Sequence, residues 1–152
     1  MSPERFLAIT SHQLRAMKQI KKKHVAVGVL ANEATARVYE GGSNVLQVAA
    51  ANEFGTTKIP QRSFLIMPQE LKANEINNFI KIQLAKVLEG REVVQALGLI
   101  GTYAVNVSVD AFASGGFGRW EALSPKTISA KGSSAPLIDT GILKNSVTYE
   151  IR

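Results

Sequence analysis

The residues best suited to chemistry lie near the C-terminus, in the run Leu137-Ile138-Asp139-Thr140-Gly141. An apolar pair followed by Asp-Thr-Gly is how dimeric aspartic proteases present a catalytic carboxylate, which shares one proton with a second aspartate. That mechanism also needs a flap over the substrate and a closing strand, and only 11 residues follow Gly141. The alternative is a structural cap formed by Asp139, Thr140 and Gly141, in which the Asp139 side chain accepts backbone N–H groups of the following turn or short helix. The sequence favours the cap and leaves the protease as a distant alternative.

A glycine-rich run, Gly-Gly-Phe-Gly at residues 115–118, is the second candidate for chemistry. Such runs bind phosphate when a strand precedes them, a helix follows and a Lys-Ser or Lys-Thr pair completes the loop. None of these surrounds residues 115–118, so we interpret the run as a hinge. His12 and His24 lack a cluster of carboxylates nearby, and the chain has no cysteine to ligate zinc. The sequence therefore predicts no catalytic centre, cofactor or metal, and a protein that is not an enzyme.

Composition indicates one globular domain. The chain has 152 residues, of which 45% are hydrophobic and 20% charged, enough for a core of its own. We find no continuous apolar run of about 20 residues and no signal-peptide core, so we expect synthesis in the cytoplasm and no membrane contact. The net charge of +6 permits contact with nucleic acid. Much of that charge is the run Lys21-Lys22-Lys23, which also suits the end of a helix.

Hydrophobic periodicity and terminal signals predict the elements that position these residues. Pro3 suits a first helical turn, and the lysine run ends that helix. Val25, Val27 and Val29 are typical of a strand. The predicted elements are a helix over residues 3–22, strands over 24–30 and 36–40, a short helix capped by Ser43 and ended by Gly55, an extended loop over 56–62, a strand or extended segment over 63–67, a helix from Pro68 to Gly90, a helix over about 91–113, and a final strand over 146–151.

The predicted fold class is α+β. A small antiparallel sheet packs against two or three helices, and a long extended C-terminal arm covers about residues 114–136. Within one domain, 1–152, we distinguish an N-terminal helix (1–22), an α+β core (23–113), the arm, and a capped turn with a final strand (137–152).

Two stretches, 56–62 and 117–136, have too little apolar content to build a core. Ordering such segments costs conformational entropy, which binding to neighbours can recover. Trp120, at the start of the arm, is either a local core residue or an interface anchor. The pattern indicates an assembly protein.

Three motifs resemble one known family. The first is Asn52-Glu53-Phe54-Gly55-Thr56 with Ile59-Pro60-Gln61-Arg62-Ser63-Phe64-Leu65. The second is Trp120-Glu121-Ala122-Leu123-Ser124-Pro125-Lys126-Thr127-Ile128. The third is Pro136-Leu137-Ile138-Asp139-Thr140-Gly141-Ile142-Leu143 with Ser146-Val147-Thr148-Tyr149. In this order and spacing they resemble the tail-completion, or head–tail joining (neck), proteins of tailed bacteriophages, also called virion morphogenesis proteins. The resemblance covers about residues 24–152 and departs at Ser63, where relatives usually have proline.

The resemblance implies a structural role without catalysis. Such proteins are small α+β subunits that form a homo-oligomeric ring in the virion, between the portal-side connector and the tail tube, after synthesis in the bacterial host cytoplasm. The implied partners are further copies of the chain, the connector or portal-adaptor proteins, and the tail terminator or tail tube. Non-specific contact with DNA in the channel is a further expectation. The residues implied to hold or contact neighbouring subunits are Asn52, Glu53, Phe54, Gly55, Ile59, Pro60, Arg62, Phe64, Trp120, Leu123, Ser124, Pro125, Pro136 and Leu137.

Two alternatives remain open at this point. Within the structural class, the chain is a tail terminator or another subunit associated with the tail tube. In a different class, it is a small basic DNA-binding module, which predicts salt-sensitive binding of DNA by the isolated monomer.

Overall fold

The computed structural model describes residues 3–31, 35, 42–132 and 141–152. Within these ranges the chain forms seven helices and two strands, which confirms the α+β class. The side chains of residues 3–10, 130 and 131 lie outside the description. The elements are α1 (Pro3–Ile20), β1 (Val25–Val29), α2 (Val45–Phe54), α3 (Ile66–Leu71), α4 (Ala73–Leu88), α5 (Val93–Ala113), α6 (Pro125–Lys131), α7 (Ile142–Asn145) and β2 (Val147–Ile151).

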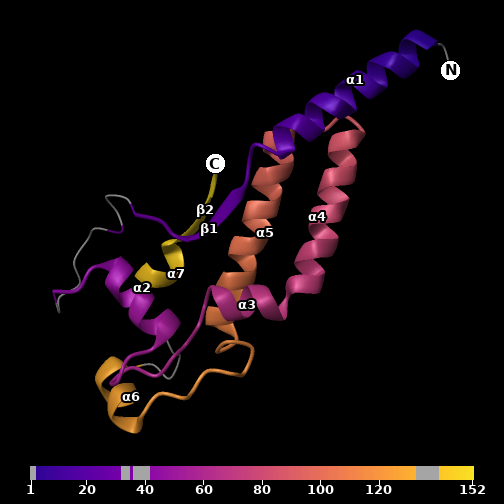
Figure 1. Ribbon diagram of the computed structural model, residues 1–152. Coiled ribbons are helices and arrows are strands. Elements are labelled where there is room, and N and C mark those ends of the chain that lie inside the picture. Colours follow the sequence, from indigo (N-terminus) through magenta and orange to yellow (C-terminus); the bar gives the residue numbers. More distant parts are fainter. Residues whose placement is uncertain (1–2, 32–34, 36–41, 133–140) are drawn as a thin grey trace.

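Helix α5 is the centre of the fold. Both strands, α3 and α4 pack against it, and α1 reaches its N-terminal end (Figure 1). By length and composition α5 could also cross a membrane, contrary to the sequence-based expectation that no segment would. Its packing accounts for that apolarity, because residues such as Ala96, Ala104 and Ala111 are buried against neighbouring elements. Within this domain α5 is a core helix.

The two strands pair antiparallel, with Val27 opposite Tyr149 and Val29 opposite Val147. Because side chains alternate along a strand, these residues share one face of the sheet, and that face covers α5. Gly101 allows the close approach: a Cβ at this position would lie 2.3 Å from Cδ2 of Tyr149. Val147, Tyr149 and Ile151 alternate along β2 and therefore lie on the face that packs against α5.

Two apolar clusters lie at opposite ends of α5. The first joins α1, α4 and the start of α5, and its buried members are Ala16, Val87, Val93, Ala96, Leu97 and Ile100. The second joins α2, the end of α5, α7 and β2, and its buried members are Val45, Ala49, Phe64, Phe112, Leu143 and Val147. The C-terminal strand is thus part of the core.

Several predicted boundaries need correction. The N-cap of α2 is Asn44 and not Ser43: the Asn44 side chain accepts from Gln47 N–H at 2.9 Å, and Gln47 accepts from Asn44 N–H at 3.0 Å. The predicted strand or extended segment over 63–67 instead runs into helix at Ile66. The single helix predicted from Pro68 to Gly90 is two helices, which meet at Lys72.

The C-terminal arm, predicted to be extended over about residues 114–136, contains a helix. Residues 125–131 form α6, with Ser124 as N-cap, Pro125 in the first turn and Gly132 in the left-handed conformation at the end. The strand predicted over 36–40 and the arm residues 133–136 lie outside the described residues.

Candidate functional site: a buried latch beside an apolar pocket

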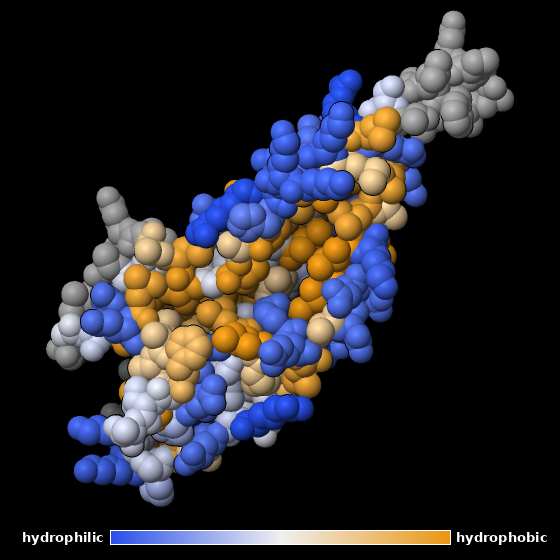
Figure 2. All heavy atoms as spheres, viewed as in Figure 1, coloured by the Kyte–Doolittle hydropathy of each residue, from blue (hydrophilic) through white to orange (hydrophobic). Residues whose placement is uncertain are grey.

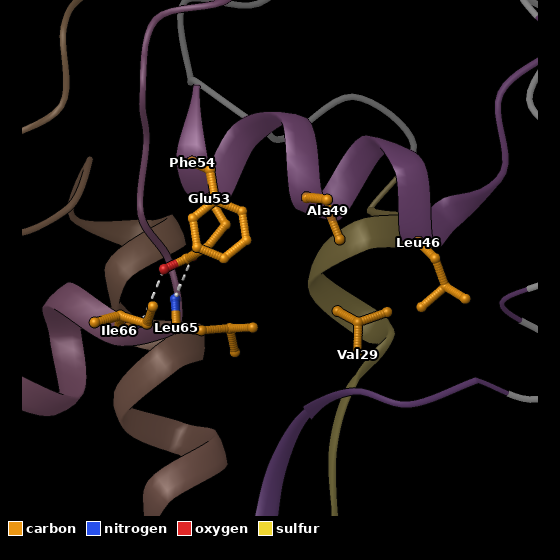
Figure 3. Close-up of a pocket in the computed structure, with 8 residues that line it drawn as sticks. Val29, Leu46, Ala49, Glu53, Phe54, Leu65 and Ile66 are labelled. Carbon is orange, nitrogen blue, oxygen red and sulfur yellow. Dashed lines mark hydrogen bonds between the residues drawn. The ribbon is translucent and has the colours of Figure 1, made fainter. Parts of the chain in front are cut away.

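Glu53, in the last turn of α2, is the most densely bonded side chain of the first motif. It is 4% exposed. Its Oε1 accepts from Ser63 Oγ at 2.6 Å and from Ile66 N–H at 3.0 Å, and its Oε2 accepts from Phe64 N–H at 2.8 Å and Leu65 N–H at 3.0 Å. Figure 3 shows the carboxylate turned toward the Leu65 and Ile66 backbone. The negative charge therefore lies at the N-terminus of α3, where unsatisfied N–H groups and the helix dipole favour it.

The loop between α2 and α3 folds back on α2. Gly55 has a φ of 75°, which turns the chain at the helix end. A tight turn follows, in which Thr56 N–H donates to the Ile59 carbonyl at 2.8 Å. Arg62 N–H then donates to the Asn52 carbonyl at 2.8 Å. This return brings Ser63 within reach of Glu53.

The first and second motifs meet at Arg62 and Trp120. The guanidinium of Arg62 donates from Nε and Nη2 to the Glu121 carbonyl, at 3.2 and 3.1 Å. The indole Nε1–H of Trp120 donates to the Ser63 carbonyl at 3.1 Å. We call Glu53, Arg62, Ser63 and Trp120 the latch, because together they bind the start of the arm to α2 and α3.

Three aromatic rings pack against the latch on the side of the core. Phe112 lies 5.1 Å from Phe64 and 5.8 Å from Trp120 between ring centroids, and the Trp120 ring meets Phe112 edge-on at 88°. Such geometry is favourable beyond the area it buries. Trp120 is therefore partly buried against the second cluster, and its role as an interface anchor remains a prediction.

The predicted hinge at residues 115–118 is a left-handed turn that returns the chain to the core. Gly115, Gly116, Phe117 and Gly118 all have positive φ, from 56° to 76°. A Cβ at Gly116 would lie 2.2 Å from Cδ1 of Trp120, so only glycine fits under the indole. The glycine run thus positions Trp120.

Lys72, between α3 and α4, lies beside this turn. Its Nζ is 5.6 Å from the centroid of the Phe117 ring and 2.8 Å from Glu75 Oε1. The hydrogen bond and charge of Glu75 raise the pKa of Lys72 above its ordinary value. Lysine is charged at neutral pH at its ordinary pKa of about 10.4, so the ammonium beside the ring can make a cation–π contact.

An apolar pocket of about 230 Å³ opens next to the latch. In Figure 3 residues of α2, the end of β1 and the start of α3 surround it. Two large side chains at the pocket are well exposed, Phe54 at 68% and Ile66 at 51%. The lining residues are Val29, Leu46, Ala49, Ala50, Glu53, Phe54, Leu65 and Ile66. The carboxylate of Glu53 is already saturated by donors, so the surface offered to a partner is apolar.

The predicted interface residues divide by burial. Asn52, Glu53, Arg62 and Phe64 are at most 7% exposed and have partners within the subunit. Phe54, Ser124 and Pro125 are exposed, and Gly55, Ile59, Pro60, Trp120 and Leu123 are partly exposed. Contact with a neighbouring subunit remains a prediction for all of these residues. For the buried ones, the structure supplies an internal role.

Sequence reasoning missed Val29, Leu46, Leu65 and Ile66 as pocket residues. The available signal was the spacing of Leu46, Ala50 and Phe54 along α2, which places a second apolar stripe beside the buried Val45 and Ala49. A surface helix with apolar residues on two sides needs a second partner.

The third motif is only partly described. Gly141 is the N-cap of α7 with a φ of 75°, and it has no side chain to accept a hydrogen bond. The predicted cap residues Asp139 and Thr140, and the predicted contact residues Pro136 and Leu137, lie outside the described part of the chain. The protease and cap alternatives for Asp139 therefore remain predictions.

Among the described residues, no group of three or more His, Asp or Glu is placed to hold a metal ion. His12 and His24 are both exposed. Comparisons with protein-family models, curated proteins and solved structures found no match to this chain.

Proposed function

We propose that the protein is a structural subunit of the bacteriophage head–tail neck, which forms a homo-oligomeric ring that completes the connector–tail interface and enables head–tail joining. The observation that supports this best is the contact between the first two motifs. Arg62 and Trp120 join them through hydrogen bonds that span 59 and 57 residues. The first two motifs of the resemblance thus belong to one structural unit.

The latch suits an assembly role because it fixes where the arm leaves the body. Trp120 and Glu121 are bound to the core, and α6 follows directly. Figure 1 shows α6 at the end of the molecule opposite α1. A ring requires heterologous interfaces, in which one surface of a subunit meets a different surface of the next. The α6 arm and the apolar pocket are two such different surfaces.

The pocket supports the proposal through its exposed apolar rim. Phe54 and Ile66 expose large side chains to water beside a hollow, and such patches mark protein-binding sites. Aromatic anchors are also enriched among residues that dominate binding energy. In this proposal Phe54 contacts the neighbouring subunit, whereas Glu53 holds the pocket wall in place. The protein acts without catalysis, cofactor or metal.

Electron microscopy of a lysate tests this function. A phage that carries an early stop codon in this gene is expected to accumulate DNA-filled heads and complete tails separately. Purified protein added to that lysate should restore infectivity. Empty heads with abnormally long tails would favour the tail-terminator alternative instead. Normal virions in the absence of the protein would overturn the neck assignment.

A further inference from the structure

The positive charge of this protein is concentrated at one end of the chain. Residues 1–31 contain six of the 18 Lys and Arg and one of the 12 Asp and Glu, a net +5 of the total +6. The remaining 121 residues contain 12 Lys and Arg and 11 Asp and Glu, a net +1. The basic character is therefore a property of α1 and the turn after it, and not of the domain body.

The cations of α1 lie on the side that faces away from the body. Ala16 and Ile20 attach α1 to the first apolar cluster. At 3.6 residues per turn, Arg15 and Lys18 share an arc centred about 150° around the helix from that attachment, and Lys21, Lys22 and Lys23 follow in the segment after α1. Figure 2 shows hydrophilic residues along the outer side of α1. We call Arg15, Lys18, Lys21, Lys22 and Lys23 the basic ridge.

Within the described part of the chain, the basic ridge is open to a partner. All five side chains are exposed. The ion pairs between described residues are Lys72–Glu75 and Arg152–Glu150, so none neutralises the ridge within that part of the chain. From Arg15 to Ile20 α1 rises about 7.5 Å, a length over which duplex DNA carries about four phosphate charges. Charge density and length thus suit a polyphosphate backbone.

We propose that the basic ridge binds the phosphate backbone of duplex DNA without reading its sequence. Phosphate contacts by Lys and Arg position a protein on DNA but carry no sequence information. An anionic membrane is the poorer fit, because Ala16 and Ile20 are packed on the protein, which leaves Leu14 and Met17, 55% and 51% exposed, as the large apolar contacts that α1 offers among its described side chains. An interfacial helix buries a broader apolar face in lipid. The inference rests on the proposed neck function only for the source of the duplex, which is the DNA that passes through the ring.

Fluorescence anisotropy of a labelled 20-base-pair duplex tests the inference with the full-length protein. The test variant is Arg15→Gln/Lys18→Gln/Lys22→Gln. The matched control is Lys58→Gln/Lys81→Gln/Lys126→Gln, which removes the same charge from exposed positions outside the ridge. For the wild type we expect the logarithm of affinity to fall with the logarithm of salt with a slope of about −4, and for the ridge variant a slope of about −2 with affinity at least about tenfold lower in low salt. The control should retain the wild-type slope.

Three outcomes would overturn the ridge proposal. Equal losses in the ridge and control variants would assign binding to net charge alone. Binding to vesicles that contain 20% phosphatidylserine but not to the duplex, in the same buffer of about 0.1 M salt, would assign the ridge to a membrane. No salt-sensitive binding to either probe would leave the ridge without an anionic partner.

The outcome for the ridge is separate from that for the neck. If the duplex does not bind but the stop-codon phage still accumulates separate heads and tails, the ridge proposal fails and the neck function stands. If the protein binds the duplex but normal virions form without it, the neck function fails. The ridge proposal then stands, and the DNA that it binds is not DNA passing through the neck.

Discussion

The indole of Trp120 is hydrogen-bonded at 3.1 Å to the carbonyl oxygen of Ser63, 57 residues earlier in the chain. The Ser63 hydroxyl in turn donates to the Glu53 carboxylate at 2.6 Å. Ser63 thus connects the start of the arm to the end of α2. Because the end of α2, the start of α3 and the arm meet at Ser63, a change at Glu53 or Trp120 should alter the packing of the second apolar cluster.

Trp120→Phe should destabilise the domain by about 1–3 kcal/mol, because phenylalanine keeps an aromatic ring against Phe112 but lacks the N–H donor for Ser63. Urea denaturation followed by far-ultraviolet circular dichroism measures the change. The neighbouring exposed residue gives a control, and Arg119→Gln should stay within about 0.5 kcal/mol of the wild type. Equal stability of Trp120→Phe and the wild type would show that the indole hydrogen bond contributes nothing.

Glu53→Gln should cost about 2–4 kcal/mol of stability. The carboxylate accepts from four donors, whereas an amide presents its own N–H groups to some of them and leaves buried donors unpaired. Thermal denaturation in parallel with Glu70→Gln measures the effect, since Glu70 is exposed on the neighbouring helix α3. If the two variants have the same Tm, the Glu53 carboxylate does not stabilise the start of α3.

Gly101→Ala should destabilise the domain, whereas Gly98→Ala should not. A Cβ at Gly101 would lie 2.3 Å from the Tyr149 ring, whereas a Cβ at Gly98 would lie 3.4 Å from the Tyr149 hydroxyl, an ordinary contact. Gly101→Ala should therefore destabilise by about 1–3 kcal/mol through overpacking. Gly98→Ala should be neutral or stabilise by up to about 1 kcal/mol through helix propensity. Chemical denaturation checks both.

A double variant checks the cause of the loss expected for Gly101→Ala. Adding Tyr149→Leu to Gly101→Ala should recover part of the loss, because the smaller side chain removes the ring that the new methyl group meets. No recovery in the double variant would mean that Gly101 is needed for a reason other than the packing of β2 on α5.

Elements with a strong local pattern were predictable from sequence. The helix expected over residues 3–22 is α1, the valine-rich strand is β1, the helix expected over about 91–113 is α5, and the final strand is β2. In each of these, periodic apolar residues determine both the element and the face it buries. Helix α6 was missed although Ser124, Pro125 and Gly132 are start and stop signals, because its low apolar content argued for an extended arm.

The latch was not predictable in the same way. Residues 63–67 have the β-branched and aromatic content of a strand, and they start a helix at Ile66 because Glu53, 13 residues earlier, satisfies its N-terminal N–H groups. The contacts of Arg62 and Trp120 span nearly 60 residues, and no local periodicity encodes them. The motifs identified these residues as important, but only the fold separates internal partners from exposed ones.

Phe54→Ser should weaken assembly without weakening the fold. Phe54 is 68% exposed at the rim of the pocket, so its loss should change the stability of the monomer by no more than about 0.5 kcal/mol. If it anchors a neighbouring subunit, its removal should cost at least about 2 kcal/mol of binding, or about 30-fold. Purified protein added to a lysate of the stop-codon phage should accordingly restore infectivity at least about tenfold less well than the wild type.

Val94→Ser is the matched control for this experiment, because Val94 is 55% exposed on α5 and does not line the pocket. It should restore infectivity as the wild type does. The opposite pattern, with Phe54→Ser fully active and Val94→Ser impaired, would move the subunit contact from the pocket to the N-terminal end of α5. Circular dichroism of both variants separates these results from misfolding, since an intact spectrum with lost joining activity can arise only from a lost contact at the exposed side chain.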